Sequence, residues 1–288
     1  MDIAKTPKAA ARTLPWPGCD ASGVLSRSYP RGKKIGQHVH REAQLLFSAQ
    51  GVMQVTTPKG RWLVPPQRAV WLPPRVEHAV DALADIEMRT LLVDPRRLAM
   101  HPEAPRLDRE FVVTVGPLLR ETVLAAFSKA PSRRPLGLLL DLALFELAEA
   151  EDPTTFMPMP VDARARRVAE LVLADPALQR PLEDLAREAG ASLRTVTRLF
   201  PAETDLTFKE WRQRARILAG LQALSGGRTT VKQVTALLGY SSVAAFGHAF
   251  RQIMGTAPSS VIPRSGSAPT GHQKARVGLR SAATTNDG

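Results

Sequence analysis

Three histidines and a glutamine in this chain have a spacing that suits the binding of a metal ion or a small molecule: His38, His40, Gln44 and His78. His38 and His40 alternate by two, so on a β-strand both side chains point to the same face. Three imidazoles with one oxygen suit Zn, Ni or Fe(II). Since Gln44 is neutral, the alternative is a small-molecule pocket that the same side chains line without a metal.

A second set of side chains has the spacing of base-reading positions on two helices. Arginine can bind guanine O6 and N7 with two hydrogen bonds, and apolar side chains suit the thymine methyl group. We therefore expect double-stranded DNA as a partner. The expected contacts on the first helix are Arg194, Thr195, Thr197 and Arg198, and those on the second are Val243, Ala244, Gly247, His248 and Arg251.

The elements that must position these side chains form a helix-turn-helix pattern that occurs twice, in residues 182–200 and 231–250. In the first copy Ala186 is small enough for the second helix to cross close above it. Gly190 can end the first helix in a left-handed conformation, and Ser192 can cap the next one. The second copy repeats the pattern with a turn that is one residue longer.

A long helix is expected between the two units, from Phe208 to Leu224, with Thr207 as its N-cap. Its ~17 residues form a rod of roughly 25 Å. Such a rod can hold two recognition helices about one turn of DNA apart, ~34 Å. The alternative interpretation is a pair of ordinary helical hairpins within a bundle, which the presence of two copies disfavours.

Residues from about Ala163 to Ile262 resemble the DNA-binding domain of AraC/XylS-family transcription regulators. The similarity lies in RLFPAETDLTFKEWRQRARI and in GYSSVAAFGHAFRQIMGTAPSSV, which includes Gly255 and Pro258. Asp205 departs from the family, which usually has glycine at a left-handed turn there, and aspartate tolerates that conformation at modest cost. The resemblance implies that the two sets of outward side chains face successive major grooves.

The N-terminal half contains short β-like runs broken by proline and glycine, which predict a sandwich or barrel. The spacing of His38, His40 and Gln44 is similar to the first cupin motif, and Arg75 and His78 resemble part of the second. The resemblance is to the cupin or jelly-roll sensor domain of many AraC-family regulators. Gln44 stands in place of the usual glutamate ligand, and Arg75 in place of a turn glycine.

The composition supports binding to nucleic acid. The net charge is +12 and the pI is about 10.6, and about two thirds of the basic excess lies after Met159, where the helix-turn-helix units are. The sequence has neither an apolar run that could cross a membrane nor an N-terminal apolar segment of signal-peptide type. The single cysteine, Cys19, cannot form an internal disulfide, so a cytoplasmic location is expected.

The expected fold class is α+β with several domains: an N-terminal cupin or jelly-roll barrel with following helices, and a C-terminal all-α domain whose two helix-turn-helix units are joined by a long helix. Apolar stripes at 117–129 and 135–151 predict two helices that pack on each other and on the barrel or form a dimer interface. The stripe of the second helix runs through Leu138, Leu139, Leu142 and Phe145. The expected division is a flexible N-terminus at 1–22, a sensor domain at 23–94, a helical region at 95–151, a linker at 152–160, a DNA-binding domain at 161–263 and a disordered tail at 264–288.

Together these observations predict a cytoplasmic, non-enzymatic transcription regulator that reads a specific DNA sequence and responds to a small-molecule effector. Its further partners would be RNA polymerase, if it activates, and a second copy of the chain in a homodimer. The first unit, which carries the arginines, is expected to supply more of the specificity. The main rival is a metal-dependent cupin enzyme with an accessory DNA-binding domain. A protein that coats DNA without sequence preference is a third alternative.

Overall fold

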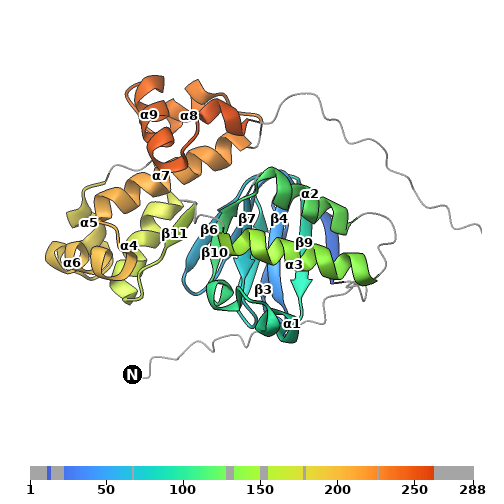
Figure 1. Ribbon diagram of the computed structural model, residues 1–288. Helices are drawn as coiled ribbons and strands as arrows, with labels where there is room; N and C mark the ends of the chain where they lie inside the picture. The colour runs from blue at the N-terminus through green and yellow to red at the C-terminus, as the bar shows by residue number, and fades with distance from the viewer. Residues whose placement is uncertain are drawn as a thin grey trace, which may run out of the picture.

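The computed structural model describes residues 12–13, 23–66, 68–127, 133–149, 155–177, 180–225 and 227–262. Two β-sheets form the N-terminal part and helices form the C-terminal part, with strand β11 between them (Figure 1). The expected α+β fold class is confirmed. Most of the predicted flexible N-terminus, with Cys19, and the predicted disordered tail lie outside the described residues. Within the described part of the chain, no helix is long and apolar enough to cross a membrane.

One sheet has six strands in the order β1–β3–β8–β5–β6–β11. In that order they are Arg12–Thr13, Lys34–Val39, His78–Ala82, Met53–Thr56, Gly60–Val64 and Phe156–Pro158. Neighbouring strands are antiparallel except for β1 and β3. The pairing of β3 with β8 places His38 opposite His78, so the register of this sheet brings together two histidines that are far apart in the sequence.

The second sheet has five antiparallel strands in the order β10–β7–β4–β9–β2. In that order they are Phe111–Thr114, Arg68–Leu72, Ala43–Gln50, Ile86–Val93 and Val24–Tyr29. Inward-facing residues of both sheets, among them Leu46, Met53, Val70 and Met88, form one apolar cluster. The two sheets therefore pack face to face as a sandwich, one of the two architectures that the short β-like runs predict.

Three strands lie outside the range that the sequence predicts for the barrel, and one of them, β1, lies in the expected flexible N-terminus. Strand β10 occupies part of the region expected to be helical, and β11 occupies part of the expected linker at 152–160. The sequence of β10, FVVT, is rich in β-branched residues, and three of its four residues are buried. Strand β11 pairs with β6, and its Met157 is buried. The sheets thus include one strand that precedes α2 and α3 in the sequence and one that follows them.

Helices α2 (Pro117–Ala126) and α3 (Arg133–Glu149) lie against the outer face of the five-stranded sheet (Figure 1). They follow α1 (Pro95–Met100) and the short 3₁₀ helix η1 (Ala104–Leu107). Helix α3 buries Leu140 and Leu144, whereas Leu138 and Phe145 are 71% and 44% exposed. The apolar stripe predicted through Leu138 and Phe145 is therefore wrong as a packing face. Since α3 is apolar on nearly all sides, its spacing does not specify which side is buried.

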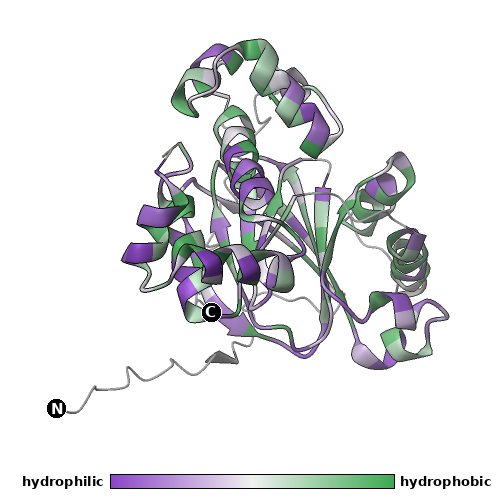
Figure 2. Ribbon diagram, turned by 90° about the vertical axis from the view of Figure 1, so that its left-hand side faces the viewer, coloured by the Kyte–Doolittle hydropathy of each residue, from purple (hydrophilic) through white to green (hydrophobic). Residues whose placement is uncertain are grey.

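The C-terminal helices are α4 (Ala163–Ala174), α5 (Leu182–Glu188), α6 (Leu193–Thr204), α7 (Phe208–Ser225), α8 (Val231–Leu237), α9 (Val243–Met254) and η2 (Pro258–Val261). They pack around a core that includes Trp211 and Phe250, and the same cluster contains Leu63 and Met157 of the six-stranded sheet. The core therefore continues from the sheet into the helices. Hydrophilic residues cover much of the outer surface of the helices that face the viewer in Figure 2.

Candidate nucleic-acid interface and sensor site

The first helix-turn-helix unit consists of α5 and α6. Gly190 has a φ of 69°, the left-handed conformation that lets α5 end without a Cβ penalty. The amide of Ala191 donates to the oxygen of Ala186 over 2.9 Å, which closes the turn. The hydroxyl oxygen of Ser192 accepts from the amide of Thr195 and caps α6. The local signals of the sequence therefore produce the expected turn.

The second unit, α8 and α9, is built in the same way. Gly239 has a φ of 68°, and the amide of Tyr240 donates to the oxygen of Thr235 over 3.0 Å. Ser242 caps α9 through the amide of Ala245. Because the cap follows the glycine by three residues here and by two in the first unit, the second turn is one residue longer, as predicted.

Helix α6 divides into an inner and an outer face. Val196 and Phe200 are fully buried, whereas Arg194 and Arg198 are exposed on the other side. The hydroxyl of Thr197 is exposed and donates to the oxygen of Leu193 over 2.9 Å, and that of half-buried Thr195 is bonded to Ser192. The two threonine hydroxyls already have partners within the helix. The arginines are therefore the principal hydrogen-bond donors on this outer face.

The outer face of α9 differs from the prediction at one position. Val243, Ala244, His248 and Arg251 are exposed as expected. Gly247, which was also expected to face outward, is buried. A Cβ atom built on Gly247 would lie 3.6 Å from Nη1 of Arg251, so the arginine side chain folds back over the glycine. The available surface of α9 is thus made by the other four side chains.

Ion pairing distinguishes the arginines of the outer faces from several arginines on α4, on α5 and just before α5. Arg164 pairs with Asp162, and two further pairs join Arg180 to Glu188 and Arg187 to Asp184. Within the part of the chain that the structure describes, Arg194, Arg198 and Arg251 have no carboxylate partner. The cations that remain uncompensated on these two helices therefore lie on the faces predicted to meet DNA, where phosphate and guanine recognition need them.

Helix α7 holds the two units in a fixed relation. It begins at a capping box in which the hydroxyl oxygen of Thr207 accepts from the amide of Glu210 and the Glu210 carboxylate accepts from the amide of Thr207. Nη2 of Arg212 donates to the oxygen of Arg180, and Nη2 of Arg216 donates to the oxygen of Leu238. One helix thus binds the segment before the first unit and the turn of the second.

The left-handed turn between α6 and α7 is made by Asp205, whose φ is 56°. This conformation is the one predicted at the position where the AraC/XylS family usually has glycine. The second non-glycine residue with positive φ among the described residues is Arg75, at 64°, which is also a position where the cupin motif has glycine. Both departures therefore keep the backbone conformation and place a larger side chain on it.

The four side chains of the predicted sensor site meet at one end of the sandwich. His38 and His40 lie on or beside β3, Gln44 on β4 and His78 on β8. His38, Gln44 and His78 are almost fully buried, and His40 is partly exposed. The ring centroids are 4.3 Å apart for His38 and His78 and 5.2 Å apart for His40 and His78. The structure thus brings together all four residues that the sequence singled out.

Electrostatics keep two of these imidazoles neutral. Burial lowers the pKa of His78 to about 3, against a smaller opposing effect of its hydrogen bond to the oxygen of Val76. Burial also lowers the pKa of His38, opposed by its hydrogen bond to the oxygen of Gly36. Since neutral imidazole offers a lone pair, both rings are suited to bind a Lewis acid or a hydrogen-bond donor.

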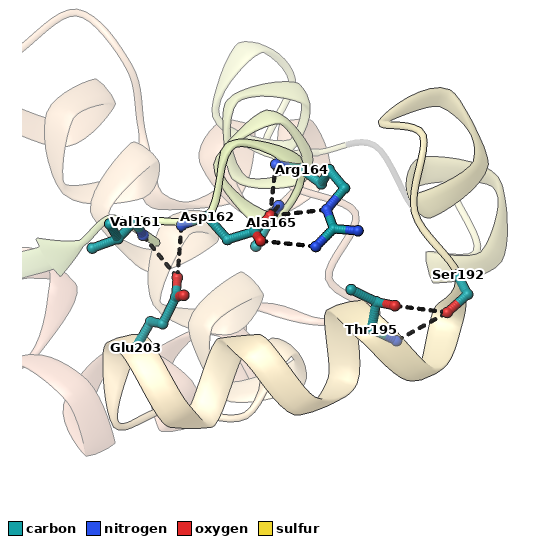
Figure 3. Close-up of polar contacts among 7 residues, drawn as sticks. All are labelled: Val161, Asp162, Arg164, Ala165, Ser192, Thr195 and Glu203. Carbon is teal, nitrogen blue, oxygen red and sulfur yellow. Dashed lines mark hydrogen bonds and ion pairs between the residues drawn. The ribbon is translucent and has the colours of Figure 1, made fainter.

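A junction that the sequence did not predict connects the sensor sheet to the helices. The ring of Phe156 on β11 stacks on Trp62 of β6 at 3.9 Å, and the indole nitrogen of Trp211 donates to the oxygen of Pro158 over 2.7 Å. The amides of Val161 and Asp162, which follow Pro158 closely in the chain, donate to the carboxylate of Glu203 on α6, over 2.7 and 3.0 Å (Figure 3). Strand β11 is therefore bonded to α7, on which Trp211 lies. The residues that follow it are bonded to α6, the first recognition helix, through Glu203.

Further hydrogen bonds at the start of α4 fix the segment that is bonded to Glu203. Asp162 accepts hydrogen bonds from the side chain and the amide of Arg164, and these hold its pKa at about 2 (Figure 3). The carboxylate is thus ionised at neutral pH and caps α4. The chain from β11 to α4 is fixed at both ends by side chains that the sequence pattern alone did not single out.

Comparison with known proteins matches both halves of the chain. Residues 22–148 match the family described as AraC-like ligand binding domain, and residues 185–264 match a family described as helix-turn-helix domain. Among solved structures, fatty-acid-bound ToxT from Vibrio cholerae aligns over 82% of this chain and 93% of its own, at 14% identity and a TM-score of 0.35. The transcriptional regulator RipA of Corynebacterium glutamicum is 33% identical over 103 residues, which are 36% of this chain and 31% of RipA.

A longer match decides the family. The transcriptional regulator NimR of Escherichia coli is 31% identical over 230 residues, which cover 79% of this chain and 82% of NimR. The chain belongs to the AraC family of transcriptional regulators. The family resemblance stated from the sequence is therefore confirmed. In this regulator the helix-turn-helix match begins within α5 and covers the rest of both units. The ligand-binding match covers α2, nearly all of α3 and the strands of the sandwich except β1 and β11.

Proposed function

We propose that this regulator reads a specific promoter sequence with the outer faces of α6 and α9. The observation that carries the proposal is the pair of capped, glycine-turned helices whose exposed arginines, Arg194, Arg198 and Arg251, lack carboxylate partners among the described residues. Arg194 and Arg198, with Thr195 and Thr197, would occupy one major groove. Val243, Ala244, His248 and Arg251 would occupy the next, with the apolar pair suited to thymine methyl groups.

The second part of the proposal is that a small-molecule effector binds at His38, His40, Gln44 and His78 and changes DNA binding through β11. An effector shifts a regulator only if it prefers one of two states. Strand β11 is suited to separate such states, because it pairs with the sensor sheet and its Pro158 is bonded to α7. Val161, three residues further along the chain, is bonded to α6. A shift of the sheet edge would therefore move the helices that face DNA.

The remaining partners and the location follow from the same proposal. A cytoplasmic protein of this kind would contact RNA polymerase if it activates transcription. A homodimer would use the exposed apolar side chains of α3, which include Leu138 and Phe145. The proposal assigns no catalysis to the protein. A metal-dependent cupin enzyme with an accessory DNA-binding domain is the rival, and turnover of a small substrate by the purified protein would establish it.

The test is selection of bound fragments from a random DNA library by the purified full chain, at about 150 mM salt where non-specific binding is weak. We expect enrichment of a motif with two contacted blocks about one helical turn, ~34 Å, apart. Retention of DNA without enrichment, at a specificity ratio near one, would favour a protein that coats DNA. A folded protein that retains no DNA would contradict the proposal for the effector-free state.

A further inference from the structure

The three histidines of the sensor site each place Nδ1 against a main-chain oxygen. A backbone carbonyl oxygen can only accept, so a ring nitrogen that lies against it must carry the proton. The other nitrogen, Nε2, then carries a lone pair. Each Nδ1 lies at hydrogen-bond distance from a main-chain oxygen: His38 from Gly36 at 2.9 Å, His40 from Glu42 at 3.0 Å and His78 from Val76 at 2.9 Å.

Ring nitrogens of the three histidines come together in a largely buried place. One ligand atom from each of the three histidines can be chosen so that all lie within 4.8 Å of one another. His78 is only 1% exposed, and its Nε2 has no hydrogen-bond partner. Burying an acceptor without a donor costs free energy, because the bond to water that it loses is not replaced. A hydrogen-bond donor or a cation at the centre of the site would therefore stabilise Nε2 of His78.

Gln44 adds a second indication of what that is. Its Oε1 lies 2.8 Å from Nε2 of His40, so in the tautomer described above two acceptors face each other. Rotating the amide would give His40 a donor, yet it would leave Nε2 of His78 without one. A cation at the meeting point provides a partner for Oε1 and for the imidazole nitrogens at once.

We propose that this site binds one divalent transition-metal ion of the Zn²⁺, Ni²⁺ or Fe²⁺ class through Nε2 of His38, His40 and His78 and Oε1 of Gln44. The proposal rests on the proposed function, since it gives a ligand to the same effector site. Three backbone oxygens orient the rings, as outer partners of metal-bound histidines do. Zn–N bonds of about 2.0–2.1 Å in a tetrahedron separate the nitrogens by about 3.3 Å, which small side-chain rotations reach.

The test uses the untagged full chain, stripped of metal with a chelator and dialysed separately against Zn²⁺ or Ni²⁺. We expect one ion per chain by elemental mass spectrometry, and a Co²⁺-loaded sample whose visible spectrum indicates nitrogen and oxygen ligands. His78→Gln should weaken binding at least tenfold. Gln44→Glu should strengthen it, because a carboxylate replaces a neutral ligand. This second variant keeps the side-chain shape and does not depend on tolerance of a changed histidine.

A matched control is His101→Gln. His101 lies in the same domain, is 8% exposed and also has a buried Nε2 without a hydrogen-bond partner, but it does not belong to the cluster. Its replacement should leave the ion content unchanged. Less than one tightly bound ion in a folded wild-type protein, or equal losses in His78→Gln and His101→Gln, would overturn the proposal. Fragment selection with the metal-free protein tests DNA binding separately. A failure of the metal-site proposal can therefore be told apart from a failure of the proposed DNA binding.

Discussion

The indole nitrogen of Trp211 donates a 2.7 Å hydrogen bond to the main-chain oxygen of Pro158. Trp211 lies on α7, the helix that joins the two recognition units, and Pro158 is the last residue of the strand that completes the sensor sheet. Trp211 is fully buried and Pro158 is half-buried, so the bond is partly shielded from water, and its net contribution is about 1 kcal/mol. A second, longer hydrogen bond joins the same two elements, from Nη1 of Arg214 to the oxygen of Phe156 over 3.4 Å.

Trp211→Phe removes this donor and keeps an aromatic side chain in the core. We expect the free energy of unfolding to fall by about 1–3 kcal/mol, because the oxygen of Pro158 loses its donor and the smaller ring leaves part of the buried space of Trp211 empty. Amide hydrogen exchange should show faster exchange in residues 155–162. The affinity of the effector-free protein for its selected DNA sequence should change little, while the response to the effector should weaken.

The matched control is Trp71→Phe. Trp71 makes an equivalent indole bond of 2.9 Å, but to the oxygen of Leu107 within the sensor domain. This variant should lose a similar amount of stability without faster exchange at 155–162. Equal exchange in the two variants would mean that the Trp211 bond has no specific role at the junction.

Gly60→Ala tests the contact between β6 and β11. A Cβ atom at this position would lie 2.4 Å from the oxygen of Met157 and 2.6 Å from the ring of Phe156, so the β11 backbone must move. We expect a loss of about 1–3 kcal/mol in urea unfolding, as for other overpacked sites. Gly36→Ala is the control, because a Cβ atom there has no heavy atom within 4 Å. A control as destabilised as Gly60→Ala would contradict the steric explanation.

Arg198→Ala tests which unit supplies the specificity. Loss of a two-bond guanine contact should cost about 1–3 kcal/mol and relax the preference at one base. Arg187→Ala, whose side chain pairs with Asp184 at 2.9 Å, should have a much smaller effect. The measurement is fragment selection with each variant. The proposed ranking is wrong if Arg198→Ala keeps the preferred sequence while His248→Ala alters it.

Glu110→Gln tests a buried carboxyl. Burial raises the pKa of Glu110, and this effect exceeds the opposing ones of Lys59, 4.0 Å away, and of the Thr57 hydroxyl, which donates over 3.2 Å. A carboxyl with a raised folded pKa binds its proton more tightly in the folded chain. The free energy of unfolding therefore falls as pH rises from the unfolded value, about 4.3, through the folded pKa.

Since glutamine does not ionise, Glu110→Gln should be more stable than the wild type at pH 7.5, with an advantage that disappears near pH 4. Urea unfolding across this range measures it. Glu121→Gln is the control, because that side chain is 75% exposed and should show no such pH-dependent difference. An advantage of Glu110→Gln that is independent of pH would contradict the titration of Glu110 as its cause.

The helix-turn-helix units could be predicted because their signals are local. Gly190 and Gly239 adopt left-handed conformations, and Ser192 caps α6, in each case because of the residue type at that position. The buried faces follow from helical spacing. The burial of Gly247 could not be predicted, since it depends on where the flexible side chain of Arg251 folds.

The residues of the sensor site could be predicted from the sequence, but the strand pairing around them could not. The spacing of His38 and His40 indicates one face of a strand, but the register that places His78 opposite His38 is a property of the sheet. Strand β11 was not predictable, because three residues are too few to show a period. Its conformation comes from pairing with β6 and from the stack of Phe156 on Trp62. Non-local contacts therefore decide the junction.

Strand β11 also covers a sheet edge that could otherwise pair with the edge of another molecule. It covers the edge of β6, and its own outer edge carries Pro158, which has no backbone donor. A sensor fragment that ended at residue 151 would expose the main-chain groups of β6, an edge onto which the same strand of another molecule can add. Fragments for biophysical work therefore need to retain residues 155–160, and chain cleavage at this segment would expose an aggregation-prone edge as well as separate the domains.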